Sequence, residues 1–180
     1  TSPECRGRLG LPPIPPPDQN AAAAAADRQA ELLKPAGSLG RLETLAVQIA
    51  GLRGGAADPP HKLVLVFAAD HGVAGDGVSA YPAAVTAQML TSFEQGVAAV
   101  NVLARQVGAD LLVVDVGVAG ERPGGRGGGG VGVVRDRRLR PGTASFLAGP
   151  AMTRAETEAA IRLGAEVVAE QVERGVDLVA

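Results

Sequence analysis

The stretch Leu63-Val64-Leu65-Val66-Phe67-Ala68-Ala69 is a short continuous apolar run, and Asp70-His71-Gly72 follows it directly. Such a run is typical of a strand that is buried on both faces of a parallel sheet. A second run, Leu111 to Val116, and a third, Val176 to Ala180, have the same character, and helical segments separate the three. Because strands that alternate with helices imply right-handed crossovers, the sequence predicts an α/β fold with an open, doubly wound parallel sheet flanked by helices.

The helices of this α/β part, which we assign to residues 61–180, follow from local signals. Pro82 suits a first helical position and predicts a helix over Pro82 to Met89, and helical composition resumes over Glu94 to Gln106. Thr153-Arg154-Ala155-Glu156 is a capping box and opens a helix that ends at about Arg174. These helices are expected to cover the sheet.

A glycine-rich segment at residues 120–132 follows the second strand. A phosphate-binding loop would space its glycines with other residues and lead into a helix. This segment does neither, so we interpret it as a flexible surface insertion.

The residues before the sheet divide into a tail and a small helical part. Residues 1–17 contain Pro12-Pro13-Ile14-Pro15-Pro16-Pro17, which predicts a mobile tail or, alternatively, a docking peptide for a proline-binding module. Residues 18–55 predict two helices, the second capped by Ser38 and carrying an apolar stripe. The stripe consists of Leu39, Leu42, Leu45, Ala46, Ile49 and Leu52.

Composition excludes several classes of protein. With a formal charge of −2 over 180 residues, a basic nucleic-acid surface over the whole chain is not supported. The single cysteine, Cys5, excludes an internal disulfide and a cysteine zinc site, and two histidines leave little for a metal. No apolar run approaches the about 20 residues of a membrane span, and no secretory signal is present, so a cytoplasmic protein is expected.

Candidate site residues lie where ligands bind in open parallel sheets, beyond the carboxyl ends of the strands. Asp70 and His71 could form a proton-handling pair, since imidazole titrates near neutrality and a carboxylate can orient it. Equally, Asp70 could cap the turn while His71 packs as a loop residue. The residues alone leave both interpretations open.

Further along, Ser79, Tyr81 and Gln88 combine hydrogen-bonding groups with a flat ring. Such a lining suits a planar heteroaromatic ligand, although an ordinary loop before an amphipathic helix has the same composition. In the helical part, Lys34 and a helix start at Ser38 could together receive a phosphate. The alternative there is a plain helix corner.

Several longer segments, in this order, resemble one family, the nicotinate-nucleotide:dimethylbenzimidazole phosphoribosyltransferases. The resemblance extends from about Asp27 to Ala180. Its segments are Lys34 to Glu43 (KPAGSLGRLE), Phe67 to Val73 (FAADHGV), Gly77 to Pro82 (GVSAYP), Val85 to Met89 (VTAQM), Ala98 to Arg105 (AAVNVLAR), Val114 to Val118 (VDVGV), Gly142-Thr143, and Ala151-Met152-Thr153 with Glu156.

This resemblance implies a Rossmann-like parallel sheet with a smaller helical domain, assembled as a homodimer. It implies an enzyme in which a nitrogen of the incoming base displaces nicotinate from nicotinate mononucleotide, giving an α-ribazole phosphate without a metal or organic cofactor. Its partners would be these small molecules, with no nucleic acid and no membrane. By the same resemblance, Ser79, Tyr81 and Gln88 would bind the base, while Asp70 and His71 would belong to the pocket.

Two features of the family have no match in residues 1–180: a glycine-rich Gly-Glu-Met-Gly phosphate segment and a glutamate that accepts the proton of the base. The sequence is therefore expected to be the amino-terminal half of such a transferase, truncated on the carboxyl side of its α/β domain, and to be inactive alone. The alternative is a short, catalytically silent homologue that serves as a base-binding or dimerisation module. A generic nucleotide-binding domain is disfavoured because no dinucleotide fingerprint follows any strand.

Overall fold

The computed structural model describes residues 6, 7, 9–55, 61–120 and 133–180. Contacts divide the chain into two compact units, Thr1–Leu11 with His61–Ala180, and Pro12–Pro60. The glycine-rich segment that we interpreted as a surface insertion lies outside the described residues, apart from Gly120.

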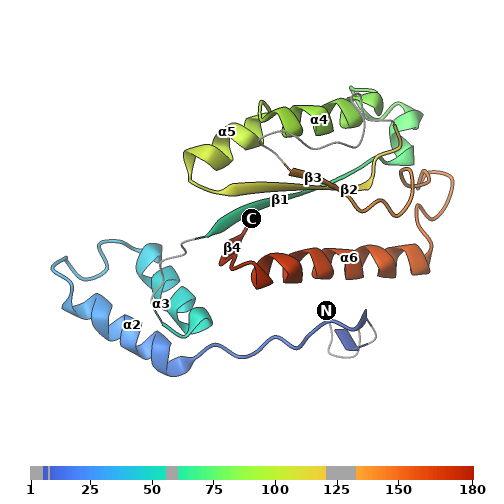
Figure 1. The fold of residues 1–180 in the computed structure, drawn as a ribbon. Coiled ribbons are helices and arrows are strands. Elements are labelled where there is room, and N and C mark those ends of the chain that lie inside the picture. Colours follow the sequence, from blue (N-terminus) through green and yellow to red (C-terminus); the bar gives the residue numbers. More distant parts are fainter. Residues whose placement is uncertain (1–5, 8, 56–60, 121–132) are drawn as a thin grey trace. The chain divides into compact units, whose positions relative to one another are not determined.

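A four-stranded parallel sheet forms the centre of the larger unit (Figure 1). Its order is β3-β2-β1-β4, with β1 at Lys62–Ala69, β2 at Asp110–Gly117, β3 at Val133–Asp136 and β4 at Leu178–Val179. The predicted α/β fold with a parallel sheet is confirmed. The two longest strands, β1 and β2, pair at its centre.

Two details of the sheet differ from the prediction. The sequence did not predict β3, because this edge strand is a partly exposed Val-Val-Arg-Asp segment without a continuous apolar run. The third predicted strand covers only Leu178–Val179 of Val176 to Ala180. Its start is later because the Val176 amide still donates to the Gln171 carbonyl near the end of the preceding helix.

Helices cover both faces of the sheet, as Figure 1 shows, with α4 (Ala84–Gln95) and α5 (Ala99–Gln106) on one side and α6 (Arg154–Glu173) on the other. Alternate strand residues point to opposite faces, so each side has its own core. One buried cluster consists of Leu63, Leu112, Val114, Leu163, Val167 and Val176. The other consists of Ala87, Leu90, Val113 and Val118.

The capping box of α6 is confirmed. The Thr153 hydroxyl accepts a hydrogen bond from the Glu156 amide at 3.2 Å, and the Glu156 carboxylate accepts one from the Thr153 amide at 2.7 Å. The helix expected from Pro82 begins later, with Ala83 as its N-cap, and continues past Met89. No residue between Met89 and Glu94 breaks the helix, so it continues to Gln95. Its C-cap is Gly96, which has a left-handed φ of 75°.

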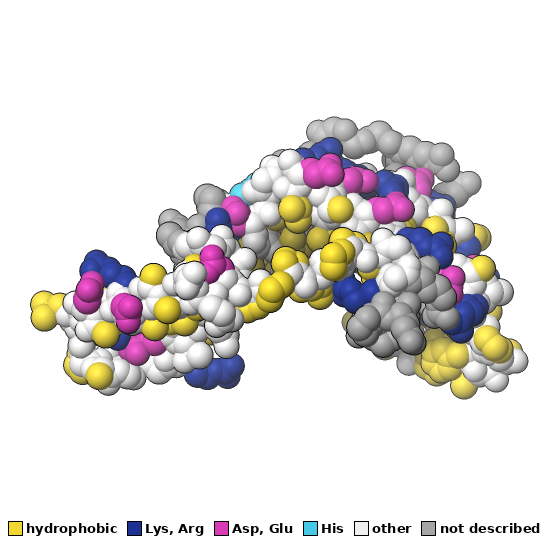
Figure 2. All heavy atoms as spheres, turned by 90° about the horizontal axis from the view of Figure 1, so that it is seen from below, with side chains coloured by type: hydrophobic (Ala, Val, Ile, Leu, Met, Phe, Trp, Pro, Cys, Tyr) yellow, Lys and Arg dark blue, Asp and Glu magenta, His cyan; other side chains and the backbone are white. Residues whose placement is uncertain are grey.

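In the smaller unit, α2 (Gln19–Glu31) packs against α3 (Arg41–Arg53). Contact occurs through Gly51, where an added Cβ would lie 3.2 Å from the Ala22 Cβ. The predicted apolar stripe of α3 is largely exposed, with Leu42 at 64% and Leu52 at 71%. Small residues on another face of α3 allow the close approach, and Figure 2 shows hydrophobic side chains on the surface of this unit.

Ser38 does not cap α3, contrary to the prediction. The N-cap is Gly40, with no side-chain cap, and Ser38 lies in the turn before it. The Glu43 carboxylate accepts a hydrogen bond from the Leu39 amide at 3.2 Å and so satisfies a donor at the helix start. Within the described part of the chain, no helix has the length and apolarity to cross a bilayer.

Candidate functional site

The ends of β1 and β2 and the loop after β3 are joined by backbone hydrogen bonds at the carboxyl end of the sheet. The Asp70 amide donates to the Gly117 carbonyl at 3.0 Å, and the Gly142 amide donates to the same carbonyl at 2.8 Å. The Thr143 amide donates to the Asp70 carbonyl at 3.0 Å. Three segments that are distant in sequence therefore share one small hydrogen-bonded network.

Two buried carboxylates extend this network. Asp70 is 7% exposed, and its Oδ2 accepts a hydrogen bond from the Ala119 amide at 2.7 Å. Asp115 is fully buried, and its Oδ1 accepts from the Gly117 and Val118 amides at 3.1 and 2.9 Å. Each carboxylate thereby satisfies backbone donors that would otherwise lack a partner in this turn.

The structure decides between the two interpretations of Asp70 only in part. Its carboxylate bonds to a backbone amide, and the described residues show no hydrogen bond between Asp70 and His71. His71, expected under one interpretation to pack as a loop residue, is instead exposed. A proton-handling pair has no support in this geometry, whereas a turn-holding Asp70 does.

Gly72 lies in close contact with the loop that precedes α6. A Cβ on Gly72 would lie 2.5 Å from the Ser145 nitrogen and 2.6 Å from the Ala144 carbonyl carbon. The Gly72 amide donates to Thr143 Oγ1 at 3.4 Å, and the Ser145 hydroxyl donates to Asp76. Only a glycine allows the backbone segments to approach this closely.

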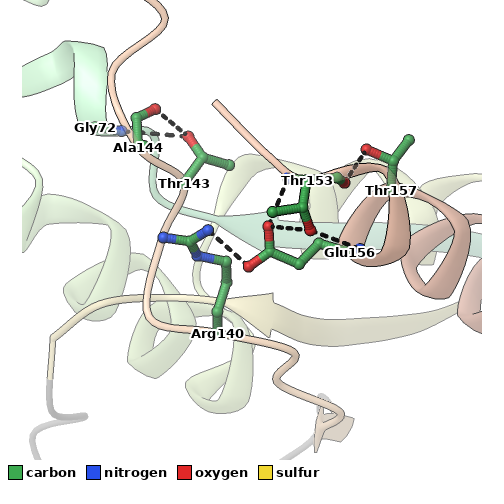
Figure 3. A network of polar contacts seen from close by, with 7 residues as sticks. All are labelled: Gly72, Arg140, Thr143, Ala144, Thr153, Glu156 and Thr157. Carbon is green, nitrogen blue, oxygen red and sulfur yellow. Dashed lines mark hydrogen bonds and ion pairs between the residues drawn. The ribbon is translucent and has the colours of Figure 1, made fainter. Parts of the chain in front are cut away.

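Figure 3 shows how this loop is fixed to α6. Arg140 Nη1 donates to Glu156 Oε1 at 2.8 Å, while the other carboxylate oxygen of Glu156 accepts from the Thr153 amide and hydroxyl. The Thr153 amide, then its hydroxyl, and to a lesser extent Arg140 hold the pKa of Glu156 below its usual value. Glu156 is therefore an anionic anchor for the loop at neutral pH.

The segment between β1 and α4 carries the residues predicted to bind the base. After the short η1 turn (Gly72–Asp76), the Ser79 hydroxyl accepts a hydrogen bond from the Tyr81 amide at 3.2 Å. Tyr81 is 72% exposed, and Ser79 and Gln88 are exposed as well. All three side chains are open to a ligand, and the described residues show no hydrogen bond from one of these side chains to another.

Lys34 and Ser38, considered above for phosphate binding, belong to the helical unit. Lys34 Nζ forms an ion pair with Glu43 Oε1 at 2.7 Å, and both side chains are largely covered. This hydrogen bond is the main reason that the pKa of Glu43 is lowered. The ion pair accounts for the lysine structurally, so a role in phosphate binding stays a prediction.

Sequence reasoning missed Arg138 and Arg140, whose guanidinium groups donate to Asp115 and Glu156 at this end of the sheet. Both follow β3, a strand that the sequence did not reveal, so nothing marked them as lying at the carboxyl end of a sheet. The run Arg137-Arg138-Leu139-Arg140 directly after an edge strand was the available signal. Within the described ranges, no three His, Cys, Asp or Glu side chains cluster as metal ligands.

Comparison with known proteins places these observations in a family. A family model described as Phosphoribosyltransferase matches residues 14–180. Among curated proteins, the nicotinate-nucleotide–dimethylbenzimidazole phosphoribosyltransferase of Desulforudis audaxviator is 48% identical over 168 residues, covering 93% of this chain and 46% of the relative. The protein of the same name from Roseiflexus castenholzii is 49% identical over 164 residues, covering 91% and 45%.

A solved structure is similar as well. The crystal structure of the nicotinate-nucleotide–dimethylbenzimidazole phosphoribosyltransferase from Thermus thermophilus matches with a TM-score of 0.81 and 40% identity, covering 90% of this chain and 48% of that one. The chain thus spans about half the length of the relatives that it matches. The family resemblance seen in the sequence is confirmed.

Proposed function

Because the chain belongs to the phosphoribosyltransferase family, we propose that the protein transfers the phosphoribosyl group of nicotinate mononucleotide to 5,6-dimethylbenzimidazole or a similar base. The products would be α-ribazole phosphate and nicotinate. One observation carries the proposal: the chain is 48–49% identical to two proteins named nicotinate-nucleotide–dimethylbenzimidazole phosphoribosyltransferase, over more than nine-tenths of its length. A cytoplasmic homodimer is part of the same proposal.

The reaction needs little from the protein beyond placement and one proton acceptor. A nitrogen lone pair of the base attacks the anomeric carbon of the ribose, and the bond from that carbon to the nicotinate nitrogen breaks, with its electron pair leaving on nicotinate. The base then carries an extra positive charge, which it loses when its other nitrogen releases a proton to a carboxylate. Holding the reactants in line and accepting the released proton both contribute to the rate enhancement.

The exposed side chains after β1 support a base pocket at the carboxyl end of the sheet. Tyr81 offers an aromatic face on which a benzimidazole ring can stack. The Ser79 hydroxyl and the Gln88 amide can each donate to or accept from a ring nitrogen. We propose His71 as a further wall of this pocket and Asp70 as the residue that holds its backbone.

Phosphate binding and proton acceptance are not assigned to residues of this chain. The Gly-Glu-Met-Gly type of segment does not occur among residues 1–180. We therefore expect the 180-residue chain to bind the base without converting it, and the whole product of its gene to carry the activity.

A turnover assay tests the proposal. The whole gene product is supplied with nicotinate mononucleotide and 5,6-dimethylbenzimidazole, and we expect nicotinate and α-ribazole phosphate to form in equal amounts. Base binding without turnover by the whole product would instead support a silent binding module, and neither binding nor turnover would overturn the proposal.

Base binding by the 180-residue chain is measured by calorimetric titration with 5,6-dimethylbenzimidazole. Gln88→Ala is expected to weaken the affinity several-fold, because one hydrogen bond contributes about 1 kcal/mol. Gln95→Ala, an exposed glutamine on the same helix, is the matched control and is expected to leave the affinity unchanged. Equal effects of the two variants would remove Gln88 from the pocket.

A further inference from the structure

We propose that Asp115 and Arg138 are positioning residues of the candidate site, and that their ion pair fixes the backbone from which the base-binding segment extends. The inference deepens the proposed function and rests on it for the identity of the ligand. Its structural part, the coupling of Asp115 to Asp70, stands on geometry alone. Neither residue is assigned to contact a substrate.

Two carboxylates lie side by side across the strands at this point. Asp115 on β2 is the register partner of Asp136 on β3. Like charges in such positions repel each other and destabilise the pairing of the strands. Arg138 relieves this repulsion, because its Nη2 lies 3.0 Å from Asp115 Oδ2 and 4.0 Å from Asp136 Oδ2.

The backbone of Arg138 is also held in place. The Arg138 amide donates to Asp136 Oδ1 at 3.2 Å, so the residue is fixed at the end of β3. Its side chain is 26% exposed while that of Asp115 is fully buried, so little solvent screens the pair. Removing the guanidinium group would leave the buried carboxylate without its charged partner, which is costly in a protein interior.

From Asp115 the contacts lead directly to the candidate site. While Oδ2 faces Arg138, Oδ1 accepts from the amides of Gly117 and Val118 and so sets the direction in which the chain leaves β2. That direction presents the Ala119 amide to the Asp70 carboxylate at 2.7 Å. The Gly117 carbonyl meanwhile accepts from the Asp70 amide.

The backbone at Asp70 is therefore held from three sides, by Gly117, Ala119 and Thr143. His71 follows immediately, and the segment with Ser79 and Tyr81 continues from it. An ion pair between the neighbouring strand β2 and the segment after β3 thus determines where the base-binding segment starts. If the pair served only to stabilise the fold, any equally destabilising change in the core would have the same effect on the site.

Amide hydrogen exchange on the free chain separates these two roles. The readout is the exchange rate at Ala119 and Thr143, whose amides bond to Asp70, relative to that at Val113 in the centre of β2. Arg138→Met is expected to raise this ratio by about tenfold or more, because local opening of the turn no longer requires opening of the sheet. Arg138→Lys, which keeps the charge, is expected to give an intermediate ratio and serves if the methionine variant does not fold.

Val167→Ala is the matched control. Val167 lies on α6 and is buried in the core, so its truncation lowers stability without removing a contact of the turn. We expect its ratio to stay within about twofold of the original, because general destabilisation raises all three rates together. An unchanged ratio in Arg138→Met and Arg138→Lys, or an equal rise in Val167→Ala, would overturn the positioning role.

Affinity for 5,6-dimethylbenzimidazole gives the second readout. Arg138→Met is expected to weaken it by about tenfold and Val167→Ala by less than about twofold, both measured well below the melting temperature. Equal affinities in the two variants would contradict the link from the ion pair to the pocket. If the unaltered chain does not bind the base, the proposed function fails for this chain, and the exchange ratios alone decide the positioning role.

Discussion

The two ends of strand β2 both carry an aspartate that contacts a basic side chain, but the two contacts differ in burial and in their backbone partners. At the amino end, Asp110 contacts His61 Nε2 at 2.9 Å, and the two side chains are 74% and 37% exposed. At the carboxyl end, the Asp115 side chain has no exposure, contacts Arg138 and accepts two backbone amides. The contact at Asp110 is exposed to solvent, whereas the buried Asp115 holds the backbone of the turn after β2.

This difference indicates where the sheet places its buried charge. An exposed pair gains little, because water screens both partners and the side chains lose freedom when they meet. A buried carboxylate is costly, so it persists where it satisfies donors that nothing else can reach. In this sheet such carboxylates occur at the end where the strands meet the candidate site.

The largest expected effect comes from removing the two aspartates in turn. Asp115→Ala leaves two amides without an acceptor and Arg138 without its main partner, so we expect the free energy of unfolding to fall by about 3 kcal/mol. Asp110→Ala, the matched change at the other end of the strand, is expected to cost less than about 1 kcal/mol. Urea denaturation of both variants measures the difference, and equal losses would break the comparison.

A second effect follows from the close contact at Gly72. Gly72→Ala places a Cβ against the backbone of Ala144 and Ser145, and we expect a loss of about 1–3 kcal/mol as the loop shifts. Gly75→Ala is the control, because nothing lies within 4 Å of its Cβ position. The melting temperatures of the Gly72→Ala and Gly75→Ala variants measure the difference. A Gly72→Ala protein as stable as Gly75→Ala would show that the loop does not press on this segment.

The third effect depends on pH. Because Thr153 and Arg140 lower the pKa of Glu156 below 4.5, its carboxylate stabilises the fold above that pH, and the contribution is lost as pH falls through the lowered pKa. The Glu156→Gln variant is therefore expected to have a lower melting temperature than the unaltered protein at pH about 7, and this difference is expected to shrink as the pH falls. Melting temperatures across this range measure it. A gap that widens as the pH falls would contradict the assignment.

The smallest effect is expected at the amino end of β1. His61→Ala removes a half-exposed partner of Asp110, and we expect the free energy of unfolding to change by less than about 0.5 kcal/mol. Chemical denaturation in low and high salt measures it. A loss comparable to that of Asp115→Ala would mean that the two ends of the sheet do not differ as described.

The sequence predicted those parts of the molecule that depend on neighbours along the chain. Long apolar runs revealed β1 and β2, and the capping box at Thr153 and Glu156 followed from spacing alone. Strand β3 was missed because its partly exposed residues carry no such run. The periodicity of α3 marked its apolar stripe but not the helix face that packs against α2, because that contact is made by the small residues Gly51 and Ala22.

The candidate site shows the same division. Asp70, Ser79, Tyr81 and Gln88 could be predicted as site residues because a strand end and a family motif mark them, and their roles stay predictions. The role proposed for Arg138 could not be predicted from the sequence, because that role depends on the strand register that places Asp115 beside Asp136. Such a pairing is set by how strands align in space, which a short edge strand does not disclose.

One titration tests most directly whether the base binds at the carboxyl end of the sheet. The affinity of the chain for 5,6-dimethylbenzimidazole is measured in the double variants Ser79→Ala/Gln88→Ala and His61→Ala/Asp110→Ala. We predict about a tenfold or greater loss in the first, from two missing hydrogen bonds, and no change in the second. Unchanged affinity in the first, or a loss confined to the second, would contradict the account.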